Sequence, residues 1–236
     1  MSKHFISKRL HATLIGGLAA LLLSGSALAG PPLICHPFVT AVDAKLLPWV
    51  ATTKDWRSPD PGYRVANLTA DTLRLLTPDA PMLSRMENLR RATIYASQDS
   101  RVATELLHTL LARAESPASD PRTAGLAQFD FGYLVETYRQ FDHAVGYGMV
   151  DGKVAGQLLP EFAKNAAPAE AAKVASLDAQ ALVRAAQQAV PALNAELEFA
   201  ASLMSPDNKT AALHRGRAAA GASSGSLLAQ NLAIYE

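Results

Sequence analysis

Residues 81–117 read PMLSRMENLRRATIYASQDSRVATELLHTLLARAESP. Mostly apolar side chains recur there every three or four residues, in two runs. Such a period predicts two amphipathic helices. One face carries Met82, Met86, Leu89, Thr93 and Ala96 in the first run, and Val102, Ala103, Leu106, Leu107, Leu110 and Leu111 in the second. Because only Ser97-Gln98-Asp99 separates the runs, with Asp99 suited to cap the second helix, we expect an antiparallel hairpin.

Helical patterns continue on both sides of this hairpin. Before it, Leu68, Thr72, Leu75 and Leu76 share one face of a helix that ends at Thr77-Pro78. Thr77 or Asp79 is placed to cap the first helix of the hairpin. After the hairpin, Asp120 and Pro121 predict the start of a longer helix, with proline in its first turn.

The longer helix carries two apolar stripes. The main stripe consists of Ala127, Phe131, Leu134, Tyr138, Phe141 and Val145, and the second of Leu126, Phe129 and Tyr133. A helix that is apolar on two sides packs on two sides. We therefore expect this helix to lie at the centre of the fold.

Several more helices are expected downstream. Glycines interrupt the period, so residues 146–175 are expected to form a loop with at most a short helix around 154–164. Ser176 is placed to cap a helix that runs to Ala189, Pro191 opens one that runs to Met204, and Ser205-Pro206-Asp207 opens another. Residues 216–236 are expected to form a low-complexity linker and a short C-terminal helix.

These elements predict an all-α fold of stacked antiparallel helical hairpins over residues 67–215. The low aromatic content of 6% and the abundance of alanine agree with helix. The stacking is irregular and tetratricopeptide-like at most, because the period of about 34 residues that such repeats need is not sustained.

Residues 30–66 differ from this pattern. Prolines recur at 31, 32, 37, 48, 59 and 61, so the segment is expected to be irregular and extended, with a brief helix at most around Val42–Leu47. Gly30-Pro31-Pro32 is not expected to start a helix. Trp49, Trp56 and Tyr63 lie in this segment, and half-buried aromatic residues of this kind predict that it packs onto the helical body.

Residues 1–29 have the features of a secretory signal peptide. A basic head, an apolar run from Leu10 to Leu23 and the small residues of Ala27-Leu28-Ala29 predict cleavage after Ala29. The apolar run is shorter than the roughly 20 residues of a membrane span, although a retained anchor is the alternative. We expect a soluble, exported protein, periplasmic or secreted, without a membrane span after cleavage.

The charge balance argues against nucleic acid as a partner. The whole chain has 22 Lys+Arg and 21 Asp+Glu, and the signal peptide contains three of the bases and no acid, so the mature chain has a net charge of −2. Nucleic-acid binding relies on basic patches that neutralise phosphates, and none is visible here.

Cys35 and His36 are the one pair of neighbouring residues whose side chains suggest catalysis or metal binding. A thiolate and an imidazole can bind a metal, or the imidazole can activate the thiol. Neighbouring residues of an extended segment point to opposite sides, however, and structural zinc needs four ligands. The alternative is a buried small thiol beside a polar histidine. The sequence predicts no metal and no cofactor.

Asp130 interrupts the main apolar stripe of the long helix. A half-buried carboxylate needs a partner, and Arg85, Arg90 or Arg91 of the preceding hairpin can supply one as an inter-helix salt bridge. The functional alternative is an acid facing a ligand. In that case Asp130, Arg90 and Arg91 would lie in a groove lined by Phe131, Tyr133 and Tyr138.

Three strings carry a family resemblance: GPPLICHPF at residues 30–38, MENLRRATIYA at 86–96 and LEFAA at 197–201. In these the chain resembles a family of uncharacterised exported bacterial proteins. The resemblance spans most of the mature chain. It implies export from a bacterial cell and no particular activity.

Two classes of function remain open. The first is a non-catalytic helical protein of the bacterial envelope that binds a protein or a small ligand, because no nucleophile–base–acid set is visible. The second is a metal- or thiol-dependent envelope enzyme or redox protein that uses Cys35 and His36.

Overall fold

The computed structural model describes residues 32–50, 58–146 and 156–235, and these ranges form an all-α fold, as the sequence predicts. The helices of these ranges are α1 (Pro32–Cys35), α2 (Leu68–Leu75), α3 (Met82–Ala96), α4 (Ser100–Glu115), α5 (Pro121–Gly146), α6 (Leu158–Asn165), α7 (Pro168–Ala175), α8 (Ala179–Ala189), α9 (Asn194–Leu203), α10 (Asn208–Gly221) and α11 (Leu227–Ile234). Two 3₁₀ helices, η1 (Val65–Asn67) and η2 (Pro191–Leu193), precede α2 and α9. The expected signal peptide lies outside the described residues.

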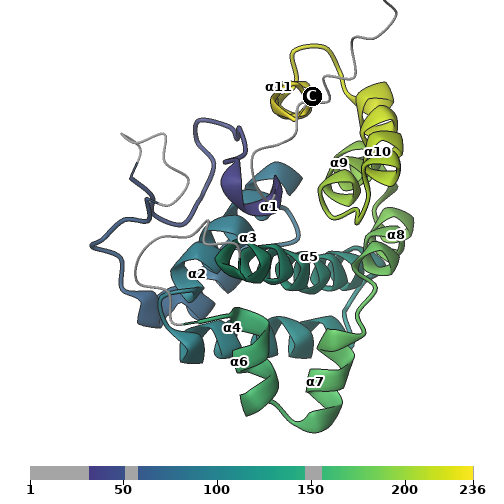
Figure 1. The fold of residues 1–236 in the computed structure, drawn as a ribbon. Helices are drawn as coiled ribbons and strands as arrows, with labels where there is room; N and C mark the ends of the chain where they lie inside the picture. Colours follow the sequence, from purple (N-terminus) through teal and green to yellow (C-terminus); the bar gives the residue numbers. More distant parts are fainter. Residues whose placement is uncertain (1–31, 51–57, 147–155, 236) are drawn as a thin grey trace, which may run out of the picture.

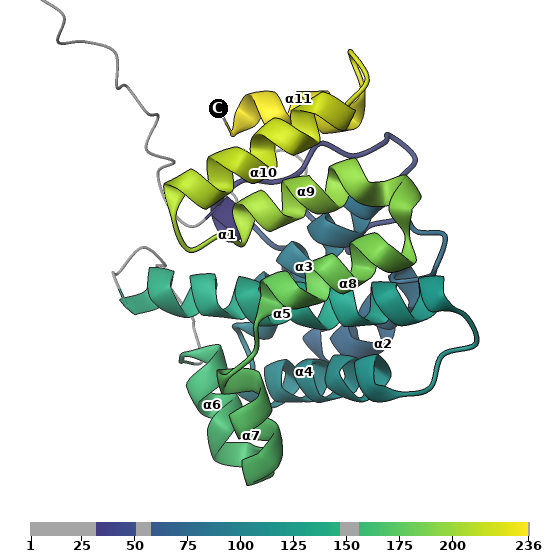
Figure 2. The same cartoon turned by 90° about the vertical axis from the view of Figure 1, so that its right-hand side faces the viewer.

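Helix α5 lies at the centre of the molecule. Figures 1 and 2 show it between α4 on one side and α8 on the other, and it also contacts α1, α3 and α6. Both of its apolar stripes are buried, with Phe129, Tyr133 and Leu134 fully inaccessible to solvent. The two-stripe pattern therefore identified the central helix correctly.

Two antiparallel hairpins flank this centre. Helices α3 and α4 are joined by residues 97–99, and the Asp99 carboxylate accepts hydrogen bonds from the Arg101 and Val102 amides, as a cap should. Helices α9 and α10 lie side by side in Figure 2, and Asp207 caps α10. The α3–α4 hairpin packs directly on α5, whereas the α9–α10 hairpin packs on α8 and α3.

Helices α5 and α8 approach closely at two glycines of α5. A Cβ atom at Gly125 would lie 2.5 Å from the Ala189 Cβ, and one at Gly132 would lie 2.9 Å from the Leu182 Cδ1. Glycine is thus required here for contact, although the helix itself would favour alanine.

The structure corrects two expectations for the second half of the chain. Residues 146–175 contain a second helix, α7, besides the expected short one, α6. Only Val174 of α7 is buried, so the helix lacks the apolar stripe that would reveal it. Asp178, not Ser176, caps α8. Helix α10 ends at Gly221 and so spans the domain boundary placed at residue 215.

The N-terminal segment also differs in detail. A short helix, α1, starts at Pro32. Proline fits the first helical position because the N–H group that it lacks would have no partner within the helix there. Residues 42–47 are not helical. Leu33, Ile34, Phe38 and Leu47 are buried in the core, so the segment packs on the body as expected. Trp56 lies outside the described residues.

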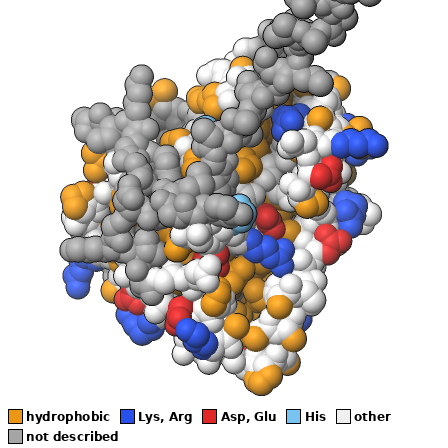
Figure 3. Space-filling view, viewed as in Figure 1, with side chains coloured by type: hydrophobic (Ala, Val, Ile, Leu, Met, Phe, Trp, Pro, Cys, Tyr) orange, Lys and Arg blue, Asp and Glu red, His pale blue; other side chains and the backbone are white. Residues whose placement is uncertain are grey.

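The surface is mixed in character. Figure 3 shows hydrophobic side chains gathered low on one face, near α6 and α7, with acidic and basic side chains around them. Within the described ranges, no helix has the length and apolar character needed to cross a membrane.

Candidate functional site: a polar face of helix α3

Helix α3 places an ion pair in the interior. Arg85 is fully buried against Asp130 of α5, and its Nη1 donates to both carboxylate oxygens, at 2.7 and 2.6 Å. Arg113 of α4 brings a second guanidinium to 3.7 Å. Burial raises the pKa of Asp130, and the two arginines offset that rise only in part. Of the three arginines considered from the sequence, Arg85 is the one that pairs with Asp130.

A second buried cluster lies on the next turns of α3. Glu87 accepts hydrogen bonds from Arg90 Nε and Nη2, both at 2.8 Å, and from Arg91 Nε at 2.7 Å. Burial raises the pKa of Glu87, but the two guanidiniums outweigh it, so the pKa lies below its ordinary value. Arg90 and Arg91 therefore serve Glu87, and neither contacts Asp130.

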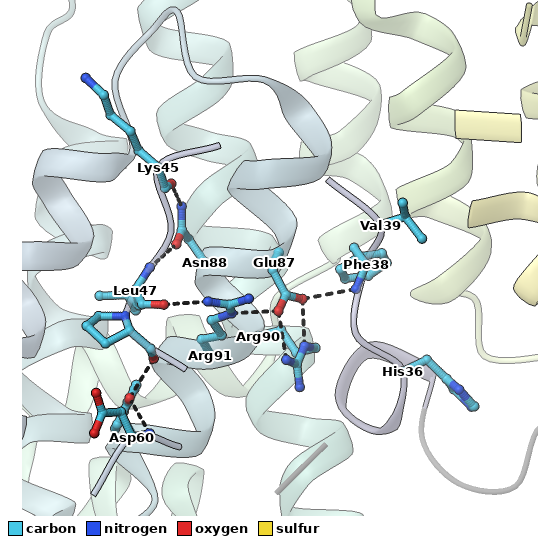
Figure 4. A network of polar contacts seen from close by, with 12 residues as sticks. His36, Phe38, Val39, Lys45, Leu47, Asp60, Glu87, Asn88, Arg90 and Arg91 are labelled. Carbon is cyan, nitrogen blue, oxygen red and sulfur yellow. Dashed lines mark hydrogen bonds and ion pairs between the residues drawn. The ribbon is translucent and has the colours of Figure 1, made fainter. Parts of the chain in front are cut away.

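The same cluster binds the backbone of residues 32–50, which we call the strap. The Phe38 amide donates to Glu87 at 3.1 Å. Arg90 donates to the Ile34 carbonyl at 3.3 Å, and Arg91 to the Leu47 carbonyl at 2.5 Å. Figure 4 shows Glu87 and Arg91 between the two halves of the strap, with hydrogen bonds to both sides. Ionised side chains of α3 thus hold an extended chain by its peptide groups.

Two asparagines each bind the strap twice. Asn88 accepts from the Leu47 amide at 2.8 Å and donates to the Lys45 carbonyl at 3.1 Å. Asn231 of α11 accepts from the Val39 amide and donates to the Val39 carbonyl, both at 2.9 Å. A carboxamide has one acceptor and two donors, so it can pair with both the N–H and the C=O groups of a backbone segment. In a β-sheet, a neighbouring strand makes these hydrogen bonds. Within the described part of the chain, no backbone–backbone hydrogen bond joins the strap to a helix.

Aromatic residues hold the two ends of the strap. Near its end, the Trp49 ring lies under the guanidinium of Arg90 at 5.0 Å, and the Tyr95 hydroxyl donates to the Pro48 carbonyl at 2.6 Å. Near its start, the Tyr235 hydroxyl lies within 3.2 Å of the Pro32 and His36 carbonyls, and its ring stacks on Phe38. The strap is therefore fixed by both α3 and the C-terminal residues.

Cys35 and His36 lie at the end of α1, both half-buried. Burial and the charge of Arg90 lower the pKa of His36, and its Nε2 is buried with no hydrogen-bond partner among the described residues. Figure 4 shows the imidazole pointing away from Glu87 and the arginines. Within the same ranges, no group of three or more His, Cys, Asp and Glu side chains could hold a metal ion.

The aromatic groove, the functional alternative for Asp130, is not formed by the residues named for it. Phe131, Tyr133 and Tyr138 are buried to 3%, 0% and 0% exposure, so none of them lines a surface. The Tyr138 hydroxyl donates to the Ala103 carbonyl of α4 at 3.2 Å. The groove was wrong because other helices cover both apolar stripes of α5, so its aromatic side chains do not reach the surface.

Three hollows instead follow the strap along its exposed side. The first, of about 370 Å³, lies between the start of α3 and residues of α9, α10 and α11. The second, of about 350 Å³, shares Ala41 and Ser84 with the first. The third, of about 380 Å³, shares Lys45 and Arg74 with the second. The hollows therefore form one row beside residues 41–48.

Sequence reasoning missed most of the residues that hold the strap. It singled out Arg90 and Arg91 but not Glu87, Asn88, Asn231 or Tyr235. One signal was available: α3 carries polar residues at 84, 85, 87, 88, 90 and 91, on every side except its apolar stripe, inside a helix that must pack. Such a helix needs buried polar partners from elsewhere in the chain.

Comparison with known proteins adds no functional assignment. No protein-family model, no curated protein sequence and no solved structure matches the chain. The strap, the polar face of α3 and the row of hollows are therefore the features that bear on function.

Proposed function

We propose that this protein is an exported, non-catalytic helical protein of the bacterial envelope that binds a protein or a small ligand beside its strap. The row of three hollows along residues 41–48 is the observation that carries the proposal. Ligand sites are concave and largely preformed, and a strap fixed to α3 and α11 supplies a rigid wall for them.

The buried ionisable groups support binding rather than catalysis. Arg85 is paired with Asp130, and Glu87 accepts hydrogen bonds from both Arg90 and Arg91. These carboxylates hold helices and backbone, so they are not available for proton transfer to a substrate. The tripartite N-terminal pattern of residues 1–29 supports export.

A crosslinking experiment tests the binding part of this proposal. A photoreactive amino acid replaces Lys45, which lines the second and third hollows, in the full chain expressed in its native host. We expect a discrete crosslinked product in the envelope fraction. The matched control is the same amino acid at Lys209, an exposed position on α10. Equal products from both positions, or none from position 45, would contradict a binding site beside the strap.

Intact mass tests the export part. Protein purified from the envelope should begin at Gly30, because the residues before it match a cleavage site. A mass that still includes residues 1–29 would favour the retained anchor.

The second candidate is a metal- or thiol-dependent function of Cys35 and His36. The unpartnered Nε2 of His36, directly beside the only cysteine of the chain, favours it. Replacement of Cys35 by serine decides between the two. In a binding protein the variant keeps its crosslinked product, whereas stoichiometric metal or a redox activity that disappears in the variant would establish the second candidate.

A further inference from the structure

The strap is held through its backbone by side chains of the helical body. Side chains from α3, α5 and α11 donate to its carbonyls or accept from its amides. These side chains are Glu87, Asn88, Arg90, Arg91, Gln140 and Asn231. Every residue except proline offers the same backbone N–H and C=O groups. Contacts of this kind select a non-helical backbone and place few demands on the side chains that it carries, as in receptors for extended peptides.

The strap is anchored by a few apolar side chains at its two ends. Its buried apolar residues are Leu33, Ile34, Phe38 and Leu47. The Phe38 ring contacts the rings of Phe199 and Tyr235, each with a centroid 6.1 Å away. Between the ends, Val42 and Asp43 form an exposed turn. The strap therefore has the form of a bound peptide, with two anchored stretches joined by a turn that points to solvent.

The site on α3 does not need the strap in order to form. Glu87 pairs with Arg90 and Arg91, three and four residues further along the same helix, at 2.8 and 2.7 Å. When the strap leaves, these pairs stay in place and water replaces its peptide groups. Apolar side chains often hold a permanently buried segment at least as firmly as buried charges do. The charges therefore add selectivity for a peptide backbone more than they add stability.

The hollows beside the strap leave room for side chains larger than its own. Ala41 lines the first and second hollows, and Ala44 lines the second. Both side chains are small, so a segment with larger side chains at these positions would fill space that the strap leaves open. Contacts in that space would add to the affinity of such a segment. The strap is thus not the tightest occupant that the site can take.

We propose that the polar face of α3 is a binding site for a non-helical peptide segment of a partner protein, and that the strap occupies this site until the partner segment replaces it. The segment has apolar residues at the positions of Ile34, Phe38 and Leu47, which are separated by four and nine residues. This inference rests on the proposed binding function and names the class of its partner. The strap is then an internal competitor, which a partner displaces only if it binds more tightly or at high concentration.

A peptide titration tests the proposal. The probe is a fluorescent peptide of residues 32–50 with serine in place of cysteine, and the purified protein is titrated against it with anisotropy as the signal. Phe38→Ala in the protein weakens the strap and leaves the side chains of α3 and α11 unchanged. The peptide should therefore bind Phe38→Ala about tenfold or more tightly than wild type, because truncation of a buried phenylalanine is costly.

Leu106→Ala is the matched control for this titration. It removes a buried side chain of α4 and leaves the strap and its partners unchanged. We expect it to bind the peptide as weakly as wild type does. Equal binding to Leu106→Ala and Phe38→Ala would show that the peptide binds any loosened fold, and this would overturn the proposal. So would no binding to folded Phe38→Ala at about 1 mM peptide, the effective concentration of a linked segment.

The thiol of Cys35 gives a second measurement on the wild-type protein. It lies in the strap, half-buried, and is the only cysteine of the chain. Excess unlabelled peptide, which has no thiol, should accelerate the reaction of Cys35 with a maleimide, because it takes the place of the strap. If Phe38→Ala does not fold, this rate decides the outcome, and an unchanged rate overturns the proposal.

Modified peptides test whether the backbone is what the site recognises. N-methylation at Phe38 and Leu47 keeps every side chain but removes the two N–H groups that Glu87 and Asn88 accept. These changes should weaken binding to Phe38→Ala about tenfold or more, as loss of a hydrogen bond to a charged group does. N-methylation at the exposed Val42 is the control and should change little. Equal effects at buried and exposed positions would contradict recognition of the backbone.

A variant of α3 places the peptide on the proposed face. Asn88→Leu, combined with Phe38→Ala, removes two hydrogen bonds to the peptide backbone and should weaken binding about tenfold. Asn165→Leu on α6, in the same combination, is the matched control at an exposed position. Unchanged affinity in the Asn88→Leu protein, with the fold intact by circular dichroism, would overturn the site.

The two binding proposals can fail separately. A ligand in the hollows beside a seated strap still gives a crosslinked product at position 45, so failure of the peptide leaves the crosslinking result valid. The titrations use pure protein, so a missing crosslinked partner in the envelope leaves them valid.

Discussion

At the residue scale, the buried pair of Arg85 and Asp130 is the most consequential contact. Asp130→Asn should lower the free energy of unfolding by about 3–5 kcal/mol, because it leaves a buried guanidinium without its counter-charge. Urea denaturation at neutral pH measures the change. The exposed Arg184→Gln serves as control and should stay within about 1 kcal/mol.

The double replacement Arg85→Met with Asp130→Leu distinguishes a pairing role from a packing role. Apolar side chains of similar volume often replace a buried ion pair without loss. We expect the double variant to recover most of the stability that Asp130→Asn loses. If it is as unstable as the single variant, the loss comes from packing around α3 and α5 and not from the unpaired charge.

Glu87 gives a pH-dependent prediction with a definite sign. Its pKa in the folded protein lies below the ordinary value of 4.5, so the unfolded chain binds the proton more tightly. The stability that Glu87 contributes is therefore complete above that value and is lost as pH falls through the folded pKa. Glu87→Gln should destabilise the protein at pH 7 and less so at pH 3. A penalty that is constant with pH would contradict the role of the carboxylate charge.

At the element scale, the packing of α4 follows directly from its stripe. Leu106 and Leu110 are fully buried, so each change to alanine should cost about 2–5 kcal/mol of stability. Leu213 on α10 is 56% exposed, and Leu213→Ala should cost less than about 0.5 kcal/mol. Thermal or urea unfolding of the three variants compares them directly.

The glycines of α5 and α10 should respond in opposite directions. Gly125→Ala places a Cβ 2.5 Å from that of Ala189, so it should destabilise the α5–α8 contact by about 1–3 kcal/mol. Gly216 is also helical, but nothing lies within 4 Å of its Cβ position. Gly216→Ala should therefore stabilise the protein by up to about 1 kcal/mol, the difference in helix propensity. Equal signs for both variants would contradict this contrast.

Elements with a continuous apolar stripe were predictable from the sequence, and others were not. The stripes of residues 82–96, 100–115 and 121–145 gave α3, α4 and α5 together with their order. Helix α7 was not predicted because it is rich in alanine and has a single buried residue, so it shows no apolar stripe. Helix α1 escaped because proline was read as a breaker and not as a first helical residue.

The candidate site was less predictable for a different reason. Asn88 and Asn231 bind peptide groups of residues that are 41 and 192 positions away. Backbone acceptors and donors are the same for every residue type except proline, which lacks the donor, so such a contact leaves no periodic pattern in the sequence. Arg90 and Arg91 were considered as partners of Asp130 because they are charged, but they bind Glu87 on their own helix.

At the scale of the whole molecule, the strap depends on the C-terminal helix. Asn231→Leu keeps the side-chain size but removes both bonds to Val39. We expect faster hydrogen exchange and proteolysis in residues 36–48, while α4 and α5 keep their protection. Gln230→Leu is the neighbouring control, since its amide contacts only the Gly225 carbonyl within α11 and the turn before it. Unchanged protection of the strap in Asn231→Leu would show that α3 alone holds it.

The bonds from Tyr235 to Pro32 and His36 join residues about 200 positions apart, and this has a kinetic consequence. During synthesis the strap is made early, whereas Tyr235, which binds it, is made about 200 residues later. The α3–α4 hairpin can form from local contacts at once, whereas seating of the strap requires closure of almost the entire chain. Refolding should therefore show early helix formation and a later phase, reported by Trp49, in which the two ends of the chain find each other.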